Sequence, residues 1–366
     1  MDVWSIAGVI AGTALTVGGA ELLVRGAARI ARRFGISPLV VGLTVVAFGT
    51  SAPEIVIGLV SVLRDQPDLA VGNVVGSTTF NILGILGVSA LIAPLVVAQK
   101  VVRLEAPILI AAALAVLAMA RGGTLDRLDG ALLLAGGVGY TLFLVRRSRH
   151  ESAAVAAEYE AELGAAPAGW SGHAAFHVLL VLVGLALLAG GAELLVGGAA
   201  ALARALGISE LVIGTTVVAI GTSLPELATS TVAALRGERD IAVGNVMGSC
   251  LFNLFVVLGI SALASPVPLP VAADALRFDL PIMVAACVSC LPIFATDRRI
   301  DRWEGGTWLV FQLAYLVVTT ASAVGSAYAP TLELALIGLA GPLVALTFGV
   351  LGLRWLRRRV RERGSA

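Results

Sequence analysis

The sequence predicts an all-α integral membrane protein, built from two five-helix units in an inverted-topology repeat plus one additional C-terminal helix. Composition, a series of long apolar stretches and an internal duplication support this prediction. Of the 366 residues, 58% are hydrophobic and only 13% are charged, and the mean hydropathy is +0.97. Soluble domains carry about 25% charged residues, so lipid is the expected surrounding of most of this chain.

Charge and cysteine usage exclude several other classes of protein. The 25 Lys and Arg against 24 Asp and Glu leave a net charge of +1, so no bulk field would attract nucleic acid. Three cysteines cannot form a disulfide framework, and the apolar composition is unlike that of a disordered chain. The 42 glycines instead fit a polytopic membrane protein, in which helices approach closely and can unwind beside a cavity.

A helix needs about 20 mostly apolar residues to span a bilayer. Eleven stretches meet this requirement, which predicts ten repeat helices and one more. The first stretch carries Asp2 instead of a basic segment and is longer than the apolar part of a signal peptide, so we expect it to stay in the protein. The predicted helices cover residues 3–24, 37–63, 69–93, 104–120, 130–145, 174–197, 209–235, 241–264, 279–295, 306–324 and 331–353.

Basic residues gather on one side of the predicted membrane. If the N-terminus lies outside, the outer loops hold only five of the 25 basic residues, namely Arg64, Arg121, Arg127, Arg204 and Arg277. The remaining basic residues lie in the inner loops and the tail, and positive charge favours the cytoplasmic side. We therefore expect a multi-pass protein of the cell membrane with its N-terminus outside and its C-terminus in the cytoplasm.

The chain contains an internal duplication. Residues 18–94 align without a gap to residues 190–266, at an offset of 172, with about 46 identical positions among 77. With two small slips in offset, the similarity continues to Leu125 and Ile300. Because five helices is an odd number, the second copy should enter the membrane from the opposite side. In secondary transporters, such inverted repeats place the substrate site near the midplane between the copies.

The duplication also predicts the domain organisation. We expect the first unit in residues 1–145, a cytoplasmic linker in 146–173 and the second unit in 174–325. The additional helix at 331–353 and a basic cytoplasmic tail at 354–366 follow. The linker is rich in Ala and Glu, which is typical of a solvated helix.

The second helix of each unit carries a carboxylate deep in an apolar stretch. The segment G-L-T-V-V-A-F-G-T-S-A-P-E ends at Glu54, and G-T-T-V-V-A-I-G-T-S-L-P-E ends at Glu226. An ionisable side chain at such depth is costly and marks an ion or substrate pathway. Pro53 and Pro225 each remove a backbone donor, so we expect both helices to break and to free carbonyl oxygens for a hard cation.

The third helix of each unit adds hydroxyl and amide groups. Its motif is G-N-V-V-G-S-T-T-F-N in the first copy and G-N-V-M-G-S-C-L-F-N in the second. Ser77 and Asn81 are four residues apart, as are Ser249 and Asn253, so each pair shares a helix face. The same residues could instead serve only to hold membrane helices together.

These candidate ligands are all oxygen donors. Calcium takes six to eight oxygens, and two glutamates would neutralise one divalent ion. Transition metals prefer His or Cys. His173 and His177 begin the sixth helix, and Cys287 and Cys290 lie in the ninth without a second pair, so we interpret all four as ordinary helix residues. We expect no cofactor; the bound ions would be the transported ones.

At these residues the chain resembles the sodium/calcium exchanger family of the calcium/cation antiporters, in its prokaryotic form without a regulatory domain. The family's repeats carry G-T-S-x-P-E and G-N-x-x-G-S-x-x-F-N, and the resemblance covers about residues 18–325. It implies an antiporter that exchanges Ca²⁺ for Na⁺ by alternating access. Carried over by position, it implies a calcium site of Glu54, Glu226, Thr50 and Thr222. It further implies positions for sodium, or shared by both ions, at Ser51, Ser223, Ser77, Ser249, Asn81, Asn253 and the carbonyls of Ala47 and Ala219.

The chain departs from the family pattern in three ways. Many members have an Asp at one of the positions of Asn81 and Asn253, whereas both are Asn here, which leaves the coupling ion and the stoichiometry open. The linker is too short for a regulatory domain, and the eleventh helix is extra.

Glu21 and Glu193 are further repeated acids, which we interpret as secondary groups for packing or ion access.

Two alternatives remain beside the sodium-driven antiporter. A proton-coupled calcium antiporter would keep the fold and use the same buried carboxyl groups to carry protons. An intramembrane enzyme would need a differentiated acid pair or an activated Ser51, but the motifs contain no His or Lys base, so we expect no enzyme. The expected partners are inorganic cations and the lipid bilayer, without nucleic acid, and nothing in the sequence implies an oligomer.

Overall fold

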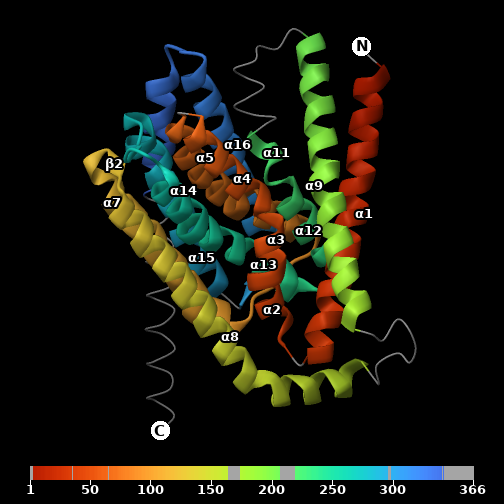
Figure 1. Cartoon of the computed structure of the whole chain (residues 1–366). Helices are drawn as coiled ribbons and strands as arrows, with labels where there is room; N and C mark the ends of the chain where they lie inside the picture. Colours follow the sequence, from red (N-terminus) through yellow and green to blue (C-terminus); the bar gives the residue numbers. More distant parts are fainter. Residues whose placement is uncertain are drawn as a thin grey trace.

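Helices form almost the whole of the structure, a computed structural model that describes residues 3–34, 36–64, 66–163, 174–206, 219–295, 298–339 and 341 (Figure 1). Among these residues, eight helices are long and apolar enough to cross a membrane, and one bent helix pair forms a ninth candidate. The predicted all-α membrane architecture is confirmed. Of the predicted span 331–353, only the helix Ala329–Leu339 lies within the described residues, and the tail 354–366 lies outside them.

The elements alternate between α-helices and short π-helical segments, which are labelled η; η4 is a 3₁₀ turn. The first half contains α1 (Val3–Phe34), α2 (Pro38–Val41), η1 (Gly42–Val46), α3 (Ala47–Thr50), α4 (Ala52–Leu63), α5 (Pro67–Phe80), η2 (Asn81–Leu86), α6 (Gly87–Ile92), β1 (Leu95–Val96), η3 (Val101–Glu105), α7 (Ala106–Met119), η4 (Ala120–Gly122), β2 (Thr124–Leu125) and α8 (Arg127–Leu163). The second half contains α9 (Ala174–Ala205), α11 (Ala219–Gly221), α12 (Leu224–Leu235), α13 (Arg239–Phe252), η7 (Asn253–Val257), α14 (Leu258–Ala264), β3 (Leu269–Pro270), η8 (Ala275–Asp279), α15 (Leu280–Ala295), β4 (Arg299–Ile300) and α16 (Arg302–Ala323).

Three helices extend beyond the predicted membrane spans that they contain, although the span predicted at 130–145 agrees with the candidate span Arg127–Arg146. The helices predicted at 3–24 and 174–197 end at Phe34 and Ala205, because the Ala- and Arg-rich segments after their apolar stretches are good helix formers. The helix predicted at 130–145 continues without interruption to Leu163, so the boundary between the first unit and the linker is not a helix end. The last part of α8 bends and runs across one end of the bundle (Figure 1).

Elements of the second half repeat those of the first at the offsets of the sequence alignment. The helices α4 and α12 have the same length and start 172 residues apart, as do α5 and α13. The strands follow the shifted offsets, since β3 comes 174 residues after β1 and β4 comes 175 after β2. Similar sequences have therefore produced the same succession of elements.

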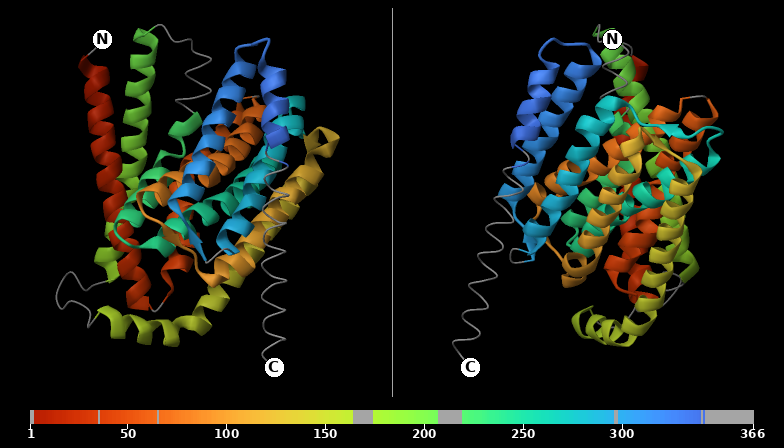
Figure 2. Two further views of the ribbon diagram at one scale, coloured as in Figure 1. Left: turned by 180° about the vertical axis from the view of Figure 1, so that it is seen from behind. Right: turned by 90° about the vertical axis from the view of Figure 1, so that its left-hand side faces the viewer.

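The first helices of the two halves, α1 and α9, pack closely against each other along most of their length. A Cβ added to Gly12 would lie 2.5 Å from the Leu195 nitrogen, and one added to Gly19 would lie 2.7 Å from the Gly184 carbonyl oxygen. Residues with higher numbers in α1 contact residues with lower numbers in α9. The two helices therefore run antiparallel, as Figure 2 shows. Glycines allow this approach, which maximises van der Waals contact between helices in lipid.

Two short sheets connect the halves. Leu95 of β1 pairs with Ile300 of β4, and Thr124 of β2 pairs with Pro270 of β3, both antiparallel. Exchanging each strand for its repeat equivalent turns the first sheet into the second. The two halves therefore contact each other through equivalent elements at both sheets.

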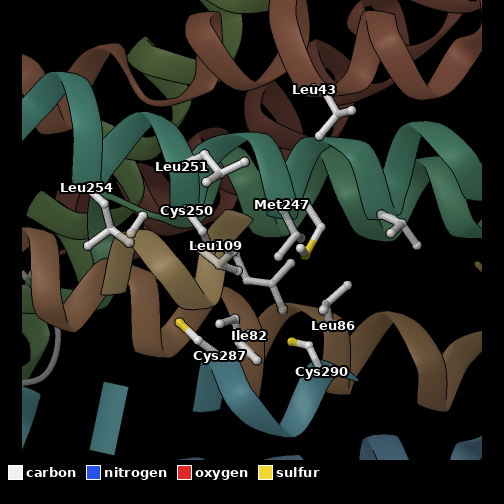
Figure 3. Close-up of a cluster of buried hydrophobic side chains, with 14 of the residues drawn as sticks. Leu43, Ile82, Leu86, Leu109, Met247, Cys250, Leu251, Leu254, Cys287 and Cys290 are labelled. Atoms are coloured by element: carbon white, nitrogen blue, oxygen red, sulfur yellow. The ribbon is translucent and has the colours of Figure 1, made fainter. Parts of the chain in front are cut away.

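The third helices lie at the centre of the protein. In the spans formed by α5 with α6 and by α13 with α14, 72% of the residues of the most apolar window are buried, against 22–50% in the other long spans. Figure 3 shows the apolar cluster around α13, to which α7, η2 and α15 contribute. Its labelled members are Leu43, Ile82, Leu86, Leu109, Met247, Cys250, Leu251, Leu254, Cys287 and Cys290. The cysteines are free thiols, and here they serve as apolar filling.

The glycine contacts of α1 give a prediction about stability. Gly12→Val should destabilise the protein by about 1–3 kcal/mol, because the new side chain meets backbone atoms of α9 that cannot move aside. Gly18→Val is the matched control, since no atom lies within 4 Å of its added Cβ. Thermal unfolding in detergent measures both. Equal melting temperatures for the two variants would show that the close approach of α1 and α9 is not needed.

Candidate functional site

The second membrane span of the first half breaks at its G-T-S-A-P-E motif. The segments Pro38–Thr50 and Ala52–Leu63 meet at an angle of 42°. Ser51 joins them with φ −83° and ψ 9°, outside the helical geometry of its neighbours. Pro53 has no N–H to donate to the carbonyl of Gly49 one turn earlier, which explains the break. The predicted interruption is therefore observed.

The equivalent segment of the second half has the same local form. A turn at Thr222 and Ser223 separates α11 from α12, and Ser223 has φ −92° and ψ 10°. Pro225 occupies the first turn of α12, as Pro53 does in α4. The start of the predicted span and of its motif, residues 209–218, lies outside the described residues.

Hydrogen bonds cross between the two broken helices. The Ser51 hydroxyl donates to Oε1 of Glu226 at 2.9 Å, and the Ser223 hydroxyl donates to Oε1 of Glu54 at 3.3 Å. Each carboxylate is thus held by the serine of the other half. The Ser223 hydroxyl also lies 3.3 Å from the Ser77 hydroxyl of α5.

The third helices complete the surroundings of both carboxylates. Ser77 of α5 lies near Glu54 and Ser249 of α13 lies near Glu226, where the Ser249 hydroxyl makes no hydrogen bond within the described residues. The Thr50 hydroxyl also faces Glu226 and bonds Asn245 Oδ1 at 3.1 Å. The site therefore combines side chains from both broken helices and both third helices.

Two asparagines of the third helices hold the backbone of the glutamates. Asn73 Nδ2 donates to the Glu54 carbonyl at 3.4 Å, and Asn245 Nδ2 donates to the Glu226 carbonyl at the same distance. Asn245 also donates to the Ser230 hydroxyl at 2.9 Å. The sequence places both asparagines on the face of the candidate ligands, but assigning them this role required the geometry. Their presence in both copies was the available signal.

The two glutamates and their serines are fully buried, yet some of the carboxylate oxygens have no hydrogen-bond partner among the described residues. Glu54, Glu226, Ser51 and Ser223 all have a relative exposure of 0%. The second carboxylate oxygen of each glutamate makes no hydrogen bond within the described residues, and no ion pair there includes either glutamate. A buried carboxylate without a cationic partner is costly, so this arrangement fits a site that is filled by cations.

Asn81 and Asn253 occupy equivalent positions next to this site. Each is the first residue of a π-helical segment, η2 or η7, and each is buried. Asn81 lies beside the Cys250 thiol, and the amide of Asn253 makes no hydrogen bond within the described part of the chain. Single π-helical turns inside α-helices are frequent at functional sites.

The remaining predicted ligands are less directly placed. Thr222 is half-buried at the turn before α12. The Ala47 carbonyl already accepts from the Ser51 nitrogen at 3.0 Å and from the Thr50 hydroxyl at 3.4 Å, so only part of its capacity is left for an ion. Ala219 begins α11. His177 is buried beside Phe176, away from the carboxylates, and His173 lies outside the described residues.

Comparison with known proteins relates most of the chain to sodium/calcium exchangers. A family model described as sodium/calcium exchanger protein matches residues 4–146 and 176–321. The inner membrane protein YrbG of Escherichia coli is 38% identical over 310 residues, covering 84% of this chain and 94% of that protein. The sodium/calcium exchanger MaX1 of Methanosarcina acetivorans is 31% identical over 340 residues, covering 85% of this chain and 97% of the relative.

A solved structure shows the same fold. The sodium/calcium exchanger from Methanococcus jannaschii superposes with a TM-score of 0.73 at 30% sequence identity. The superposition covers 87% of this chain and 99% of the other. Sequence and structure therefore agree over nearly the full length of these relatives.

The break at Ser51 gives a prediction about ion affinity. Pro53→Ala should let the helix rewind, so that backbone carbonyls return to intrahelical bonds and calcium affinity falls about tenfold (~1.4 kcal/mol). Pro67→Ala, at the first position of α5, is the control and should leave affinity unchanged. Calorimetric titration with Ca²⁺ measures both, after expression levels have been matched. Unchanged affinity in Pro53→Ala would mean that the break does not supply ligands.

Proposed function

The chain belongs to the sodium/calcium exchanger family, and from this premise we propose that it exchanges Ca²⁺ for Na⁺ across the cell membrane. Membership supports a membrane cation antiporter that handles calcium. The identity of the driving ion, the ligands and the mechanism of exchange are the proposal developed below.

The observation that supports the proposal most directly is the pair of buried glutamates. Glu54 and Glu226 interact electrostatically with each other, and each is held by a serine of the opposite half. Their two negative charges match one Ca²⁺ in a cavity that would otherwise hold uncompensated charge. The surrounding hydroxyls and amides supply further oxygens of the kind that Ca²⁺ and Na⁺ bind.

We assign the ions to these residues by position. Glu54 and Glu226 would bind Ca²⁺ together with oxygens of Thr50 and Thr222. Hydroxyls, amides and carbonyls around them would hold Na⁺ or be shared between the ions; these belong to Ser51, Ser223, Ser77, Ser249, Asn81, Asn253, Ala47 and Ala219. Of the two carbonyls, Ala47 is the weaker candidate, because it already accepts two hydrogen bonds.

Transport would proceed by alternating access between two inverted units. The antiparallel pair of α1 and α9, the equivalent sheets and the crossed Ser–Glu bonds support this architecture. A site built equally from both halves can be opened toward either side by moving one group of helices against the rest. The distribution of basic residues supports an outer N-terminus and a cytoplasmic C-terminus.

Charge balance requires the two ions to take turns. Two carboxylates can compensate one Ca²⁺ or a few Na⁺, but holding both loads would leave excess positive charge in a poorly solvated cavity. Exchange follows, because each ion can occupy the site only after the other has left it. An empty site would keep two uncompensated carboxylates and resist closure.

A proton-coupled calcium antiporter is the second candidate. Protons can neutralise the same carboxylates, so the fold and the site would serve it equally well. The G-T-S-x-P-E motifs with their paired serines Ser51 and Ser223 favour sodium, whereas the neutral residues Asn81 and Asn253 leave the coupling ion open.

Competition between the ions tests the shared site. Calcium affinity measured in detergent should fall steadily as Na⁺ is raised, and it should also fall at low pH, where protons neutralise Glu54 and Glu226. Uptake of radioactive calcium into vesicles under a sodium gradient, and then under a pH gradient, identifies the driving ion. Calcium affinity that stays constant from zero to saturating Na⁺ would exclude the shared site and favour proton coupling.

Removing either carboxylate tests the charge balance. Glu54→Gln and Glu226→Gln should each weaken calcium binding at least about 100-fold (~2.7 kcal/mol) and abolish exchange, because one carboxylate cannot balance a divalent ion. Glu21→Gln removes an acid that lies outside the site and should leave calcium affinity nearly unchanged. If Glu21→Gln abolished binding as fully as Glu54→Gln in a folded protein, the assignment of the site would be wrong.

A further inference from the structure

Repeated acidic and basic residues outside the ion site occur in two equivalent sets. Glu21 of α1 forms an ion pair with Arg236, which follows the last residue of α12. Glu21 also pairs with Arg25 one turn further along α1, at 2.6 Å. This ion pair joins the first helix of one half to the broken second helix of the other half.

The equivalent residues of the other copies, Glu193 and Arg64, do not form the corresponding ion pair within the described residues. Glu193 and Arg64 lie 172 residues from Glu21 and Arg236 in the duplication, and both are exposed. Within the described part of the chain they make no ion pair with each other. The position equivalent to Arg25 is Gly197, so Glu193 also lacks the partner within its own helix.

The packing of the helices that carry these residues differs in the same way: the helices are in contact around the formed ion pair and apart around the other. The helix α1 packs along α12, whereas its equivalent α9 makes hardly any contact with α4. Between α9 and the α3–α4 segment lies a cavity of about 1550 Å³, and Glu193 is among its lining residues. Val56 of α4 lines this cavity and is 59% exposed. The equivalent Ala228 of α12 is less exposed, since it is half-buried. The cavity follows α9 from Val178 to Gly197, so α9 is separated from the α3–α4 segment along most of its length, whereas α1 packs against α12.

We propose that Glu21–Arg236 and Glu193–Arg64 are alternative ion pairs, of which one forms in each of the two access states. This inference rests on the alternating access of the proposed function. The structure corresponds to the state in which the Glu21–Arg236 pair is formed. In the other state, α9 would approach α4 and Glu193 would meet Arg64.

The geometry explains why the two pairs exclude each other. Both glutamates belong to the α1–α9 pair, whose backbones touch at Gly12 and Gly19 and which moves most easily as one unit. Both arginines lie at the ends of the broken second helices, in the rest of the protein. Closing α1 on α12 moves α9 away from α4, so that forming one ion pair separates the other.

The effect on the equilibrium should be modest but directional. A partly exposed ion pair typically shifts an equilibrium roughly twofold to fivefold. Removing the Glu21–Arg236 pair should raise the population of the other access state relative to the observed one by that factor. Removing the Glu193–Arg64 pair should lower the same population ratio. The two carboxylates thus set the balance between the states without touching the transported ions.

Distances between spin labels on the two halves test this proposal. One label pair replaces Leu63 and Gly190 and reports the separation of α4 from α9; the equivalent pair replaces Leu235 and Gly18 and reports that of α12 from α1. Leu63 and Leu235 are 74% and 67% exposed, and neither glycine has an atom within 4 Å of an added Cβ. The three native cysteines are fully buried and can stay in place.

The variants are read by pulsed electron resonance in lipid nanodiscs without Ca²⁺ and at one fixed, saturating Na⁺ concentration. Glu21→Gln and Arg236→Gln should each increase the population with a short 63–190 distance roughly twofold to fivefold. Glu193→Gln and Arg64→Gln should each decrease it. The charge swap Glu21→Arg with Arg236→Glu should restore the original distribution, and Arg239→Gln, which removes a nearby exposed charge, should leave it unchanged.

Either of two results would overturn the proposal. Glu21→Gln and Glu193→Gln could shift the populations in the same direction, or Glu21→Gln could have no more effect than Arg239→Gln in a protein of unchanged melting temperature. Because the distances are measured without Ca²⁺, this outcome is separate from the test of Ca²⁺ binding and exchange. A failure of Ca²⁺ binding would leave the label distances intact, and unchanged distances would leave Ca²⁺ binding intact.

Discussion

The structure depends on one electrostatic constraint, the burial of two carboxylates at the centre of an apolar helical protein. Glu54 and Glu226 have no exposed surface and no basic partner among the described residues, and each keeps an oxygen without a hydrogen bond. Such a pair is stable only with compensating positive charge. The broken helices, the polar faces of α5 and α13 and the crossed serines all serve to hold oxygens around the place where that charge would lie.

The duplication explains why this site lies between the halves rather than within one of them. The Glu54 carboxylate is bonded by Ser223, and the Glu226 carboxylate by Ser51, so neither half contains a complete set of contacts. The asparagines Asn73 and Asn245 repeat the same backbone contact in both halves. A site shared in this way changes whenever the halves move relative to each other, which is what coupling of ion binding to motion requires.

Equivalence in sequence has not produced equivalence in every contact. The Glu21–Arg236 pair is formed and its counterpart is not, and α1 covers α12 where α9 leaves α4 open to a cavity. If the two ion pairs alternate as proposed, this asymmetry would belong to one conformational state, while the shared ion site would be present in both.

The sequence by itself determined the membrane character, the duplication, the broken second helix and the identity of the two central acids. These features follow from local composition, from periodicity and from identity between copies, all of which are readable along the chain. It also indicated a solvated helix in the linker, but not that this helix continues the preceding membrane span without a break to Leu163. Only the tertiary structure decided that each serine bonds the glutamate of the other half, that Asn245 holds Thr50, and that one of two equivalent ion pairs is formed. Those contacts join residues more than 140 positions apart, and their partners are set by how helices pack in three dimensions, which no local pattern records.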